Sequence, residues 1–312
     1  MYLRTLFFMI PFVMTTPLHV TNQPTLEQTT QLDNPKHSQQ SVTSVTYEEA
    51  LISQATSSSS VDAKLQTVDV AVKETAEEGP KLKKGDHVEI PILMYHLCMD
   101  KIPEGLGGMA VTPKRLEEHI KALLQAGYTP IHFKEYYDFI TYGEPLPLKP
   151  IILTFDDGYE NNYTEAFPIL KKYEVKATIF INPYTVDNEM GEYSHLDWEQ
   201  MKEMEESGLV SIQSHGYKHE NINSLSNEKL EASVKKGFER IEDELGQREI
   251  YVFSYPGYSY NERTVEKLNQ MGIHMQVTKL GEKVSNKTPL SHITRQRASQ
   301  GQSGKSLIQA IQ

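Results

Sequence analysis

Two adjacent carboxylates, Asp156 and Asp157, follow directly after the apolar segment 151–155, and Gly158 comes next. Two carboxylates at the end of a buried strand cost desolvation free energy unless a cation or a proton binds them. Gly158 allows a sharp turn, so both side chains can face the same point. A simple turn or helix cap would use only one of the two carboxylates. The pair therefore indicates a cation site or acid–base chemistry.

Two histidines, His215 and His219, follow the apolar segment 210–213. Side chains four residues apart converge if the segment coils into a helical turn, which is a frequent spacing for metal ligands. Two imidazoles and one carboxylate leave coordination positions open for water and substrate. We therefore predict that Asp157, His215 and His219 bind one divalent cation. Zn²⁺ is expected, with Co²⁺, Mn²⁺ and Ni²⁺ as alternatives.

A third histidine, His96, directly follows the apolar segment 90–95. A charged imidazole is a suitable proton donor, so His96 is a candidate general acid, although a partly buried structural histidine is the alternative. A nucleophilic pair of Cys98 with a histidine is less favoured, because it would leave the two carboxylates unexplained.

A fourth candidate segment, 253–258, runs from a strand into a turn. Aromatic residues at the end of a strand can stack against a sugar ring or merely fill the rim of a site. The predicted substrate-binding residues are Tyr255, Pro256, Gly257 and Tyr258.

The elements that must position these residues alternate between short apolar segments and helices. Helices are predicted from Thr112, a good N-cap, to Gly127, over 226–245, and from Asn261 to Gly272. The expected strands are 90–95, 129–133, 151–155, 177–181, 210–213, 250–255, 273–278 and 292–297. This alternation favours a single α/β barrel of about seven to eight parallel strands. Active sites in such barrels lie at the carboxyl ends of the strands, where the candidate residues occur.

The amino-terminal third has a different composition. Arg4 precedes an apolar run over 6–14 that is too short to span a membrane, so residues 1–20 are predicted to be a signal peptide or N-terminal anchor. Residues 21–85 are rich in Thr, Ser and Gln and predict a disordered linker. The catalytic domain is expected over 86–312. These features favour a secreted or surface-associated bacterial protein without a membrane-spanning helix; a cytosolic protein with a disordered start is the alternative.

The overall composition excludes some classes of function. The 312-residue chain has a formal net charge of −11 at pH 7, so a nucleic-acid partner is not expected. Its single cysteine excludes an internal disulfide and any cysteine-rich metal cluster.

Taken together, these motifs resemble those of the polysaccharide deacetylase family, the carbohydrate esterases with a NodB-homology domain, over roughly 88–298. The run Thr154-Phe155-Asp156-Asp157-Gly158 is similar to the first family motif. The resemblance implies that Asp156 is the catalytic base and that Asp157 binds the metal. His215 and His219 are similar to the paired histidines of the second motif.

Other features are most similar to the branch that acts on poly-N-acetylglucosamine and related polysaccharides. These are the early Met94-Tyr95-His96, the later Tyr-Pro-Gly and the lack of a Leu-x-His near the end. The resemblance implies that His96 is the general acid. Two positions depart from the family pattern. Gly216 replaces a Ser or Thr that shapes the histidine loop, and Arg295 is the expected substitute for an arginine that steadies the base. The short tail after Arg297 leaves closure of the barrel open.

The predicted reaction is hydrolysis of N-acetyl groups from a polysaccharide containing N-acetylglucosamine. Asp156 would activate water, His96 would protonate the leaving amine, and a backbone N–H near Tyr258 would help to stabilise the oxyanion. A glycosidase fits less well, because its two carboxyl groups must flank the scissile bond. A catalytically weak or silent glycan-binding domain on the cell surface stays open as the alternative.

Overall fold

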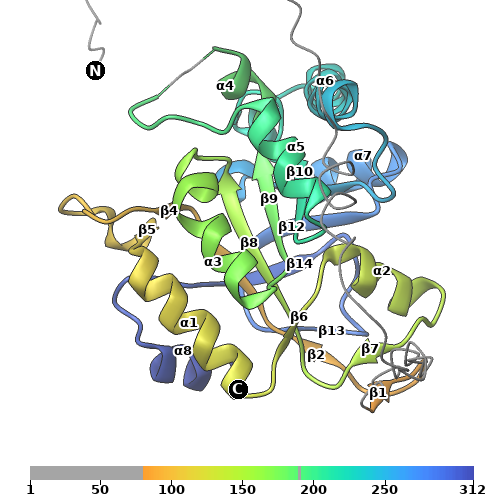
Figure 1. Cartoon of the computed structure of the whole chain (residues 1–312). Coiled ribbons are helices and arrows are strands. Elements are labelled where there is room, and N and C mark those ends of the chain that lie inside the picture. The colour runs from red at the N-terminus through yellow and green to blue at the C-terminus, as the bar shows by residue number, and fades with distance from the viewer. Residues whose placement is uncertain (1–79, 189–190) are drawn as a thin grey trace, which may run out of the picture. The chain divides into compact units, whose positions relative to one another are not determined.

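The computed structural model describes residues 80–188 and 191–312 (Figure 1). The chain divides into two units, Met1–Val72 and Lys73–Gln312, and the first lies outside the described residues. The predicted signal peptide and nearly all of the predicted linker therefore lie outside them too. Two residues of that expected linker, Lys81 and Leu82, form the short strand β1, so folded structure begins before residue 86.

Seven parallel strands in the described part of the chain close into a barrel. They are β3 (Ile92–Tyr95), β8 (Pro150–Asp157), β9 (Ala177–Ile181), β10 (Val210–Ser214), β11 (Val252–Ser254), β12 (Met275–Leu280) and β14 (Ile293–Arg297). Each strand pairs with the next one in this order, and the ring closes because β3 pairs with both β14 and β8. The predicted α/β barrel is confirmed.

The expected strand 129–133 is wrong in its length. Only β6 (Thr129–Pro130) forms, beside the start of β8. Helix α2 (Phe133–Thr141) begins at Phe133 because His132 and Glu135 form a capping box there. Among residues 80–188 and 191–312, three two-stranded pairs lie outside the barrel: β1 with β7 (Leu146–Pro147), β2 (Glu89–Ile90) with β13 (Val284–Ser285), and β4 (Leu97–Cys98) with β5 (Ala110–Val111).

The three helices predicted from their caps are confirmed as α1 (Pro113–Gln125), α6 (Asn227–Leu245) and α7 (Glu262–Gln270). The N-cap side chains accept from the third residue of each helix, as Thr112 Oγ1 does from the Arg115 N–H at 3.2 Å. The remaining helices are α3 (Phe167–Tyr173), α4 (Pro183–Asn188), α5 (Trp198–Glu206) and α8 (Gly304–Ile311). Shorter helical turns are η2 (Leu106–Gly108), η3 (Asn162–Ala166), η4 (Ile222–Ser224) and η5 (Pro256–Tyr258).

The short carboxyl-terminal tail forms a helix that packs on the start of the domain. After β14 the chain turns into α8, which packs on α1 and buries Leu307 and Ile311. The Thr112 N–H donates to Gln300 Oε1 at 2.9 Å, which ties the tail to the start of α1. The question that the short tail raised about barrel closure is thus answered by the β14–β3 pairing.

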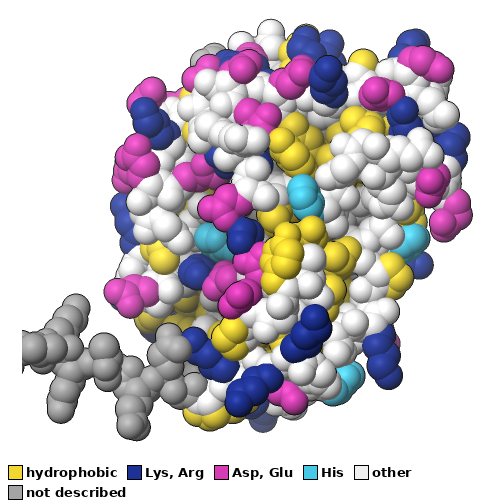
Figure 2. Space-filling model, turned by 90° about the vertical axis from the view of Figure 1, so that its right-hand side faces the viewer, with side chains coloured by type: hydrophobic (Ala, Val, Ile, Leu, Met, Phe, Trp, Pro, Cys, Tyr) yellow, Lys and Arg dark blue, Asp and Glu magenta, His cyan; other side chains and the backbone are white. Residues whose placement is uncertain are grey.

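The strand interiors are almost entirely buried, and β8 is covered along seven of its eight residues. Cys98 in β4 is also buried, and its N–H donates to Asn161 Oδ1 at 3.0 Å. On the face shown in Figure 2, acidic and basic side chains are interspersed around a group of hydrophobic ones. Within the described ranges, no helix is long and apolar enough to cross a membrane.

Candidate active site

Asp157, His215 and His219 meet at the carboxyl ends of β8 and β10. One ligand atom from each lies within 4.8 Å of the other two. Asp157 Oδ1 is 3.6 Å from His215 Nε2 and 3.5 Å from His219 Nε2. The sequence prediction that these three residues share one site is consistent with this geometry.

An unusual backbone turn presents the Asp157 carboxylate. Asp157 has a φ of 73° and Gly158 a φ of 67°, so two successive residues adopt the left-handed region. That region is unfavourable for residues other than glycine. A Cβ added to Gly158 would lie 2.7 Å from Ile181 Cγ2, so this position also requires glycine for space. The turn therefore holds Asp157 in a strained position beside the strand end.

The histidine loop converges without the helical turn that the spacing suggested. Residues 215–219 form a bent loop in which Gly216 has a φ of 80° and His219 a φ of 55°. The Asn182 amide holds this loop, donating to the carbonyl oxygens of His215 and Gly216. The Ser214 hydroxyl accepts from the Gly216 N–H at 3.2 Å. Gly216 thus suits the positive φ, and neighbouring polar groups supply the support expected from a hydroxyl.

These three side chains fit a divalent cation. Asp157 Oδ1 is buried and has no hydrogen-bond partner among the described residues, which is costly unless something binds it. His215 Nδ1 donates to the Ser254 carbonyl at 2.7 Å, which leaves Nε2 unprotonated and directed at Asp157. Burial lowers the pKa of His215 and so favours the neutral imidazole that a metal requires.

The second carboxylate, Asp156, forms a buried pair with Arg295. The Nη1 and Nη2 atoms of Arg295 donate to the two carboxylate oxygens at 2.6 and 2.7 Å. Arg295 is only 1% exposed and also donates to Thr154 Oγ1 and Ser254 Oγ. Burial, the largest single effect, would raise the pKa of Asp156, but Arg295, through its charge and its hydrogen bonds, together with the nearby His215 and His96 holds that pKa well below its usual range. Asp156 is therefore ionised at neutral pH.

His96 directly follows β3 and lies near the Asp156 carboxylate. Its Nε2 is 3.9 Å from Asp156 Oδ2, too far for a hydrogen bond, and the residue is 8% exposed. Burial, the largest effect, lowers the pKa of His96 against the opposing charge of Asp156. The carboxyl ends of β3, β8 and β10 therefore carry three groups of different character: an imidazole, an ionised carboxylate and a set of metal-type ligands.

Comparison with known proteins shows to which family the chain belongs. The polysaccharide deacetylase family profile matches residues 143–276. The Bacillus subtilis (strain 168) protein YxkH, which carries a polysaccharide deacetylase name, is 34% identical over 223 residues, covering 72% of this chain and 76% of its own. The chain belongs to the polysaccharide deacetylase family.

This polysaccharide deacetylase is also similar to one solved structure and to one further relative. The Streptococcus pyogenes deacetylase PplD, solved with acetate, superposes with a TM-score of 0.66 at 30% identity, covering 73% of this chain and all of its own. A poly-β-1,6-N-acetyl-D-glucosamine N-deacetylase of Escherichia coli (strain K12) is 31% identical over 122 residues. That match covers 34% of this chain but only 18% of the relative. The deacetylase is a hydrolase, and the barrel is the family fold.

Only part of the segment 255–258, which was predicted to bind substrate, is exposed to solvent in this deacetylase. The Tyr255 ring is 1% exposed and its hydroxyl donates to Gln276 Oε1 at 2.6 Å, so it cannot stack on a sugar. Pro256 is buried too, whereas Gly257 is exposed and Tyr258 is half-buried. Tyr258 accepts a hydrogen bond from Arg297 at 2.9 Å, and its own N–H donates to the Tyr255 carbonyl. That N–H is therefore not free for an oxyanion.

Sequence reasoning missed several residues that support the deacetylase site. Asn182 follows β9 directly, and Ser254 is the last residue of β11. Both are polar residues at the carboxyl end of a barrel strand, which is the signal that could have identified them.

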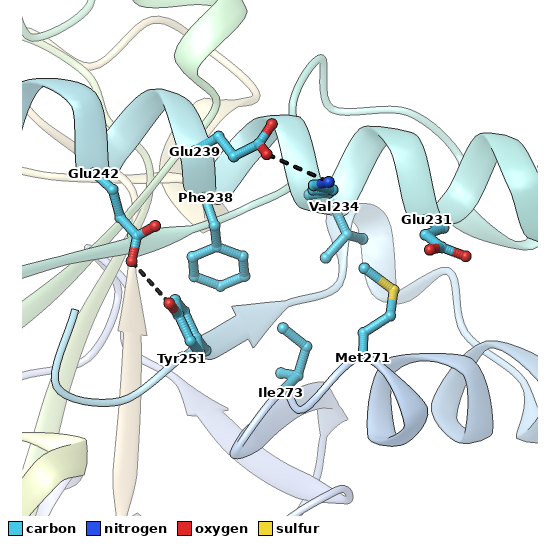
Figure 3. Close-up of a pocket in the computed structure, with 9 residues that line it drawn as sticks. Glu231, Val234, Phe238, Glu239, Glu242, Tyr251, Met271 and Ile273 are labelled. Carbon is cyan, nitrogen blue, oxygen red and sulfur yellow. Dashed lines mark hydrogen bonds and ion pairs between the residues drawn. The ribbon is translucent and has the colours of Figure 1, made fainter. Parts of the chain in front are cut away.

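A groove of about 360 Å³ on the outside of the deacetylase barrel shares no residue with this site (Figure 3). It is lined by one side of α6 and by residues 251, 271 and 273, and the Tyr251 hydroxyl donates to Glu242 across one end at 2.8 Å. This groove is thus separate from the candidate active site.

Proposed function

We propose that this deacetylase removes N-acetyl groups from a polysaccharide containing N-acetylglucosamine, with a divalent cation as cofactor, and releases acetate. The observation that carries the proposal is the set formed by His96, the Asp156 carboxylate paired with Arg295, and the three ligand atoms within 4.8 Å of one another. The name of the Escherichia coli relative supports N-acetylglucosamine as the sugar.

Each residue of the site has a different role in the proposed amide hydrolysis. A divalent cation, Zn²⁺ in our proposal, held by Asp157, His215 and His219 would supply Lewis acidity and a lowered water pKa. Asp156, kept ionised by Arg295, takes the proton of the attacking water. His96, whose Nε2 lies 3.9 Å from that carboxylate, gives a proton to the leaving amine when it is in its protonated form. Asp156 thus acts on the attacking water, and His96 acts on the nitrogen of the reacting amide.

We also propose that the protein acts outside the cell, on a cell-wall or exopolysaccharide. Arg4 and the apolar run over 6–14 support an export signal, and residues 86–312 would be the exported catalytic domain. Fractionation of cells and the mass of the mature protein test this. Protein found only in the cytosol with an intact N-terminus would contradict it.

Acetate release tests the proposed reaction. Protein from which a chelator has removed the metal is assayed on N-acetylated glycans with and without added Zn²⁺, Co²⁺ or Mn²⁺. Activity is expected only after metal is added. His219→Gln should lose most of its bound metal and its activity. The matched control is His87→Gln, which changes a histidine that is 66% exposed beside Glu89 and should change neither. Full activity in the presence of chelator would contradict metal dependence.

A further inference from the structure

Two lysines and two tyrosines form a cluster beside the histidine loop. Lys218 lies in that loop, directly before His219, and its Nζ is 4.1 Å from the centre of the Tyr184 ring. Lys236 belongs to α6, and its Nζ is 4.2 Å from the centre of the Tyr217 ring. Both lysines are exposed. We call these two lysines and two tyrosines the cationic rim.

The local packing fixes the position of the cationic rim. The Tyr184 and Tyr217 rings meet edge to face at 5.6 Å and 66°, and the Tyr184 N–H donates to the Tyr217 carbonyl at 3.0 Å. Helix α6 approaches the histidine loop closely at Gly237, where an added Cβ would lie 3.1 Å from Ser214 Oγ and 3.4 Å from the Gly216 carbonyl carbon. Helices α4 and α6 also contact each other (Figure 1). The rim is therefore built into the loop that carries two predicted metal ligands.

The two ammonium groups of the rim form no ion pair with a carboxylate among the described residues. The carboxylates around them are bonded elsewhere. Asp187 in α4 is paired with Arg240 at 3.0 Å. Glu220 accepts from the backbone N–H of Lys218 at 3.2 Å and from the Ser233 hydroxyl at 2.7 Å. The rim is thus a local excess of positive charge on a chain whose formal net charge is −11.

These ammonium groups can still bind an anion. An ammonium has three N–H donors, and an aromatic ring faces only one side of it, so the other side is open to solvent. The ring contacts also hold the long lysine side chains in place before a ligand arrives, which reduces the entropy lost on binding. Two positive charges on one side of the site therefore favour an anionic group over a neutral one.

We propose that the cationic rim binds an anionic group, a carboxylate or a phosphate, on the sugar that adjoins the reacting N-acetylglucosamine in the polymer. This inference rests on the proposed function and narrows its substrate class to polysaccharides with an acidic or phosphorylated neighbour beside the acetamide. Lys218 and Lys236 determine specificity and take no part in the chemical step. A wholly neutral polymer binds more weakly.

Binding to metal-free full-length protein tests this inference separately from catalysis. Calorimetry compares a tetrasaccharide of alternating N-acetylglucosamine and N-acetylmuramic acid with the same tetrasaccharide whose carboxylates have been converted to amides. The wild type should prefer the carboxylate form, and this preference should shrink in high salt, which screens exposed charges. An N-acetylglucosamine tetramer with one phosphate ester, compared with the unmodified tetramer, tests phosphate as the anion.

The decisive variant is Lys236→Gln, because this lysine lies on a helix outside the histidine loop. We expect it to bind the carboxylate or the phosphate form about two- to fivefold more weakly, as for the loss of one exposed ion pair, and to bind the uncharged forms unchanged. Lys236→Arg keeps the charge and should restore the preference. Lys229→Gln, at an exposed lysine of the same helix, is the matched control and should bind every glycan as the wild type does.

The opposite results are equally clear. The proposal is overturned by a wild type that binds charged and uncharged forms equally well, or binds neither. It is also overturned if Lys236→Gln weakens both forms alike, since the lysine would then act through packing. Failure of the metal-loaded wild type to release acetate would instead refute the proposed function, because the binding measurements need no turnover.

Discussion

At the scale of single residues, the buried pair of Asp156 and Arg295 distinguishes the two adjacent carboxylates. A buried ion pair is weak support for stability, since the desolvation of both charges opposes their attraction. Its value here lies in keeping Asp156 ionised, while Asp157 Oδ1 is left without a hydrogen-bond partner among the described residues. Two neighbours of identical chemistry thereby gain different roles.

Asp156→Asn should retain bound metal yet release acetate about 10²–10⁴-fold more slowly, because the amide cannot accept the water proton. Metal content and initial rates of acetate release measure this. The unfolding temperature of the variant should be recorded alongside, since Arg295 then lacks its charged partner. Turnover close to that of the wild type would refute the assignment of Asp156 as the base.

Arg295→Met should destabilise the fold by about 3–5 kcal/mol at neutral pH, because it leaves a buried carboxylate unpaired. In the wild type the folded pKa of Asp156 is depressed, so its contribution is present above the unfolded value of about 3.9 and is lost as the pH falls. In the variant, burial raises that pKa, so acidification stabilises the fold.

The unfolding temperatures of the two metal-free proteins should therefore approach each other as the pH falls from neutrality towards the unfolded value of about 3.9. Arg297→Met is the control, since it removes a guanidinium from the same strand that does not bind Asp156. A difference that stays constant with pH would show that Arg295 acts through packing alone.

At the scale of elements, the loops after the strands carry the geometry of the site. Asp157, Gly216 and His219 all adopt positive φ values, and the Asn182 amide connects the end of β9 to the histidine loop. The spacing of His215 and His219 predicted that they would converge. It could not predict how, because a bent loop held by a residue 33 positions before His215 leaves no local periodicity.

Asn182→Ala should weaken metal binding about 10- to 100-fold, since it removes the donor that orients the loop between the two histidine ligands. A competition titration with a chelating dye measures the affinity. Asn188→Ala removes a comparable hydrogen bond, to the Tyr184 carbonyl at the end of α4, and should leave the affinity unchanged. Equal affinities for both variants would mean that the loop holds itself in place.

At the scale of the whole molecule, closure of the barrel brings the first and last parts of the domain together. Arg295 reaches Asp156 only because β14 pairs with β3, which in turn pairs with β8. The alternation of strands and helices predicted the barrel, and the caps predicted three helices to within a few residues. The tail after Arg297 was too short to show from composition that α8 would pack on α1.

The same limit applies to the rim of the site. The sequence suggested that Tyr255 lies at the surface, yet its hydroxyl donates to Gln276 Oε1 in the interior. A buried tyrosine and an exposed one look alike in a single sequence. Their difference depends on which polar partner the tertiary fold provides.

Leu307→Ala should destabilise the fold by about 2–5 kcal/mol, because Leu307 in α8 is fully buried. Chemical denaturation measures this value. Leu148→Ala, at a leucine that is 54% exposed, is the matched control and should change stability by less than about 0.5 kcal/mol. A similarly small effect at Leu307 would mean that α8 docks only loosely.

The buried thiol of Cys98 makes the natural protein its own reporter of local opening. It is the only cysteine in the chain, and burial raises its pKa. A thiol-reactive dye can therefore label it only when the segment that contains β4 and β5 opens. Arg297 donates to the Gly108 carbonyl of that segment, close to the tyrosine at the rim. Comparing the rate of Cys98 labelling with and without glycan therefore measures local opening near the reacting groups. No engineered probe is needed.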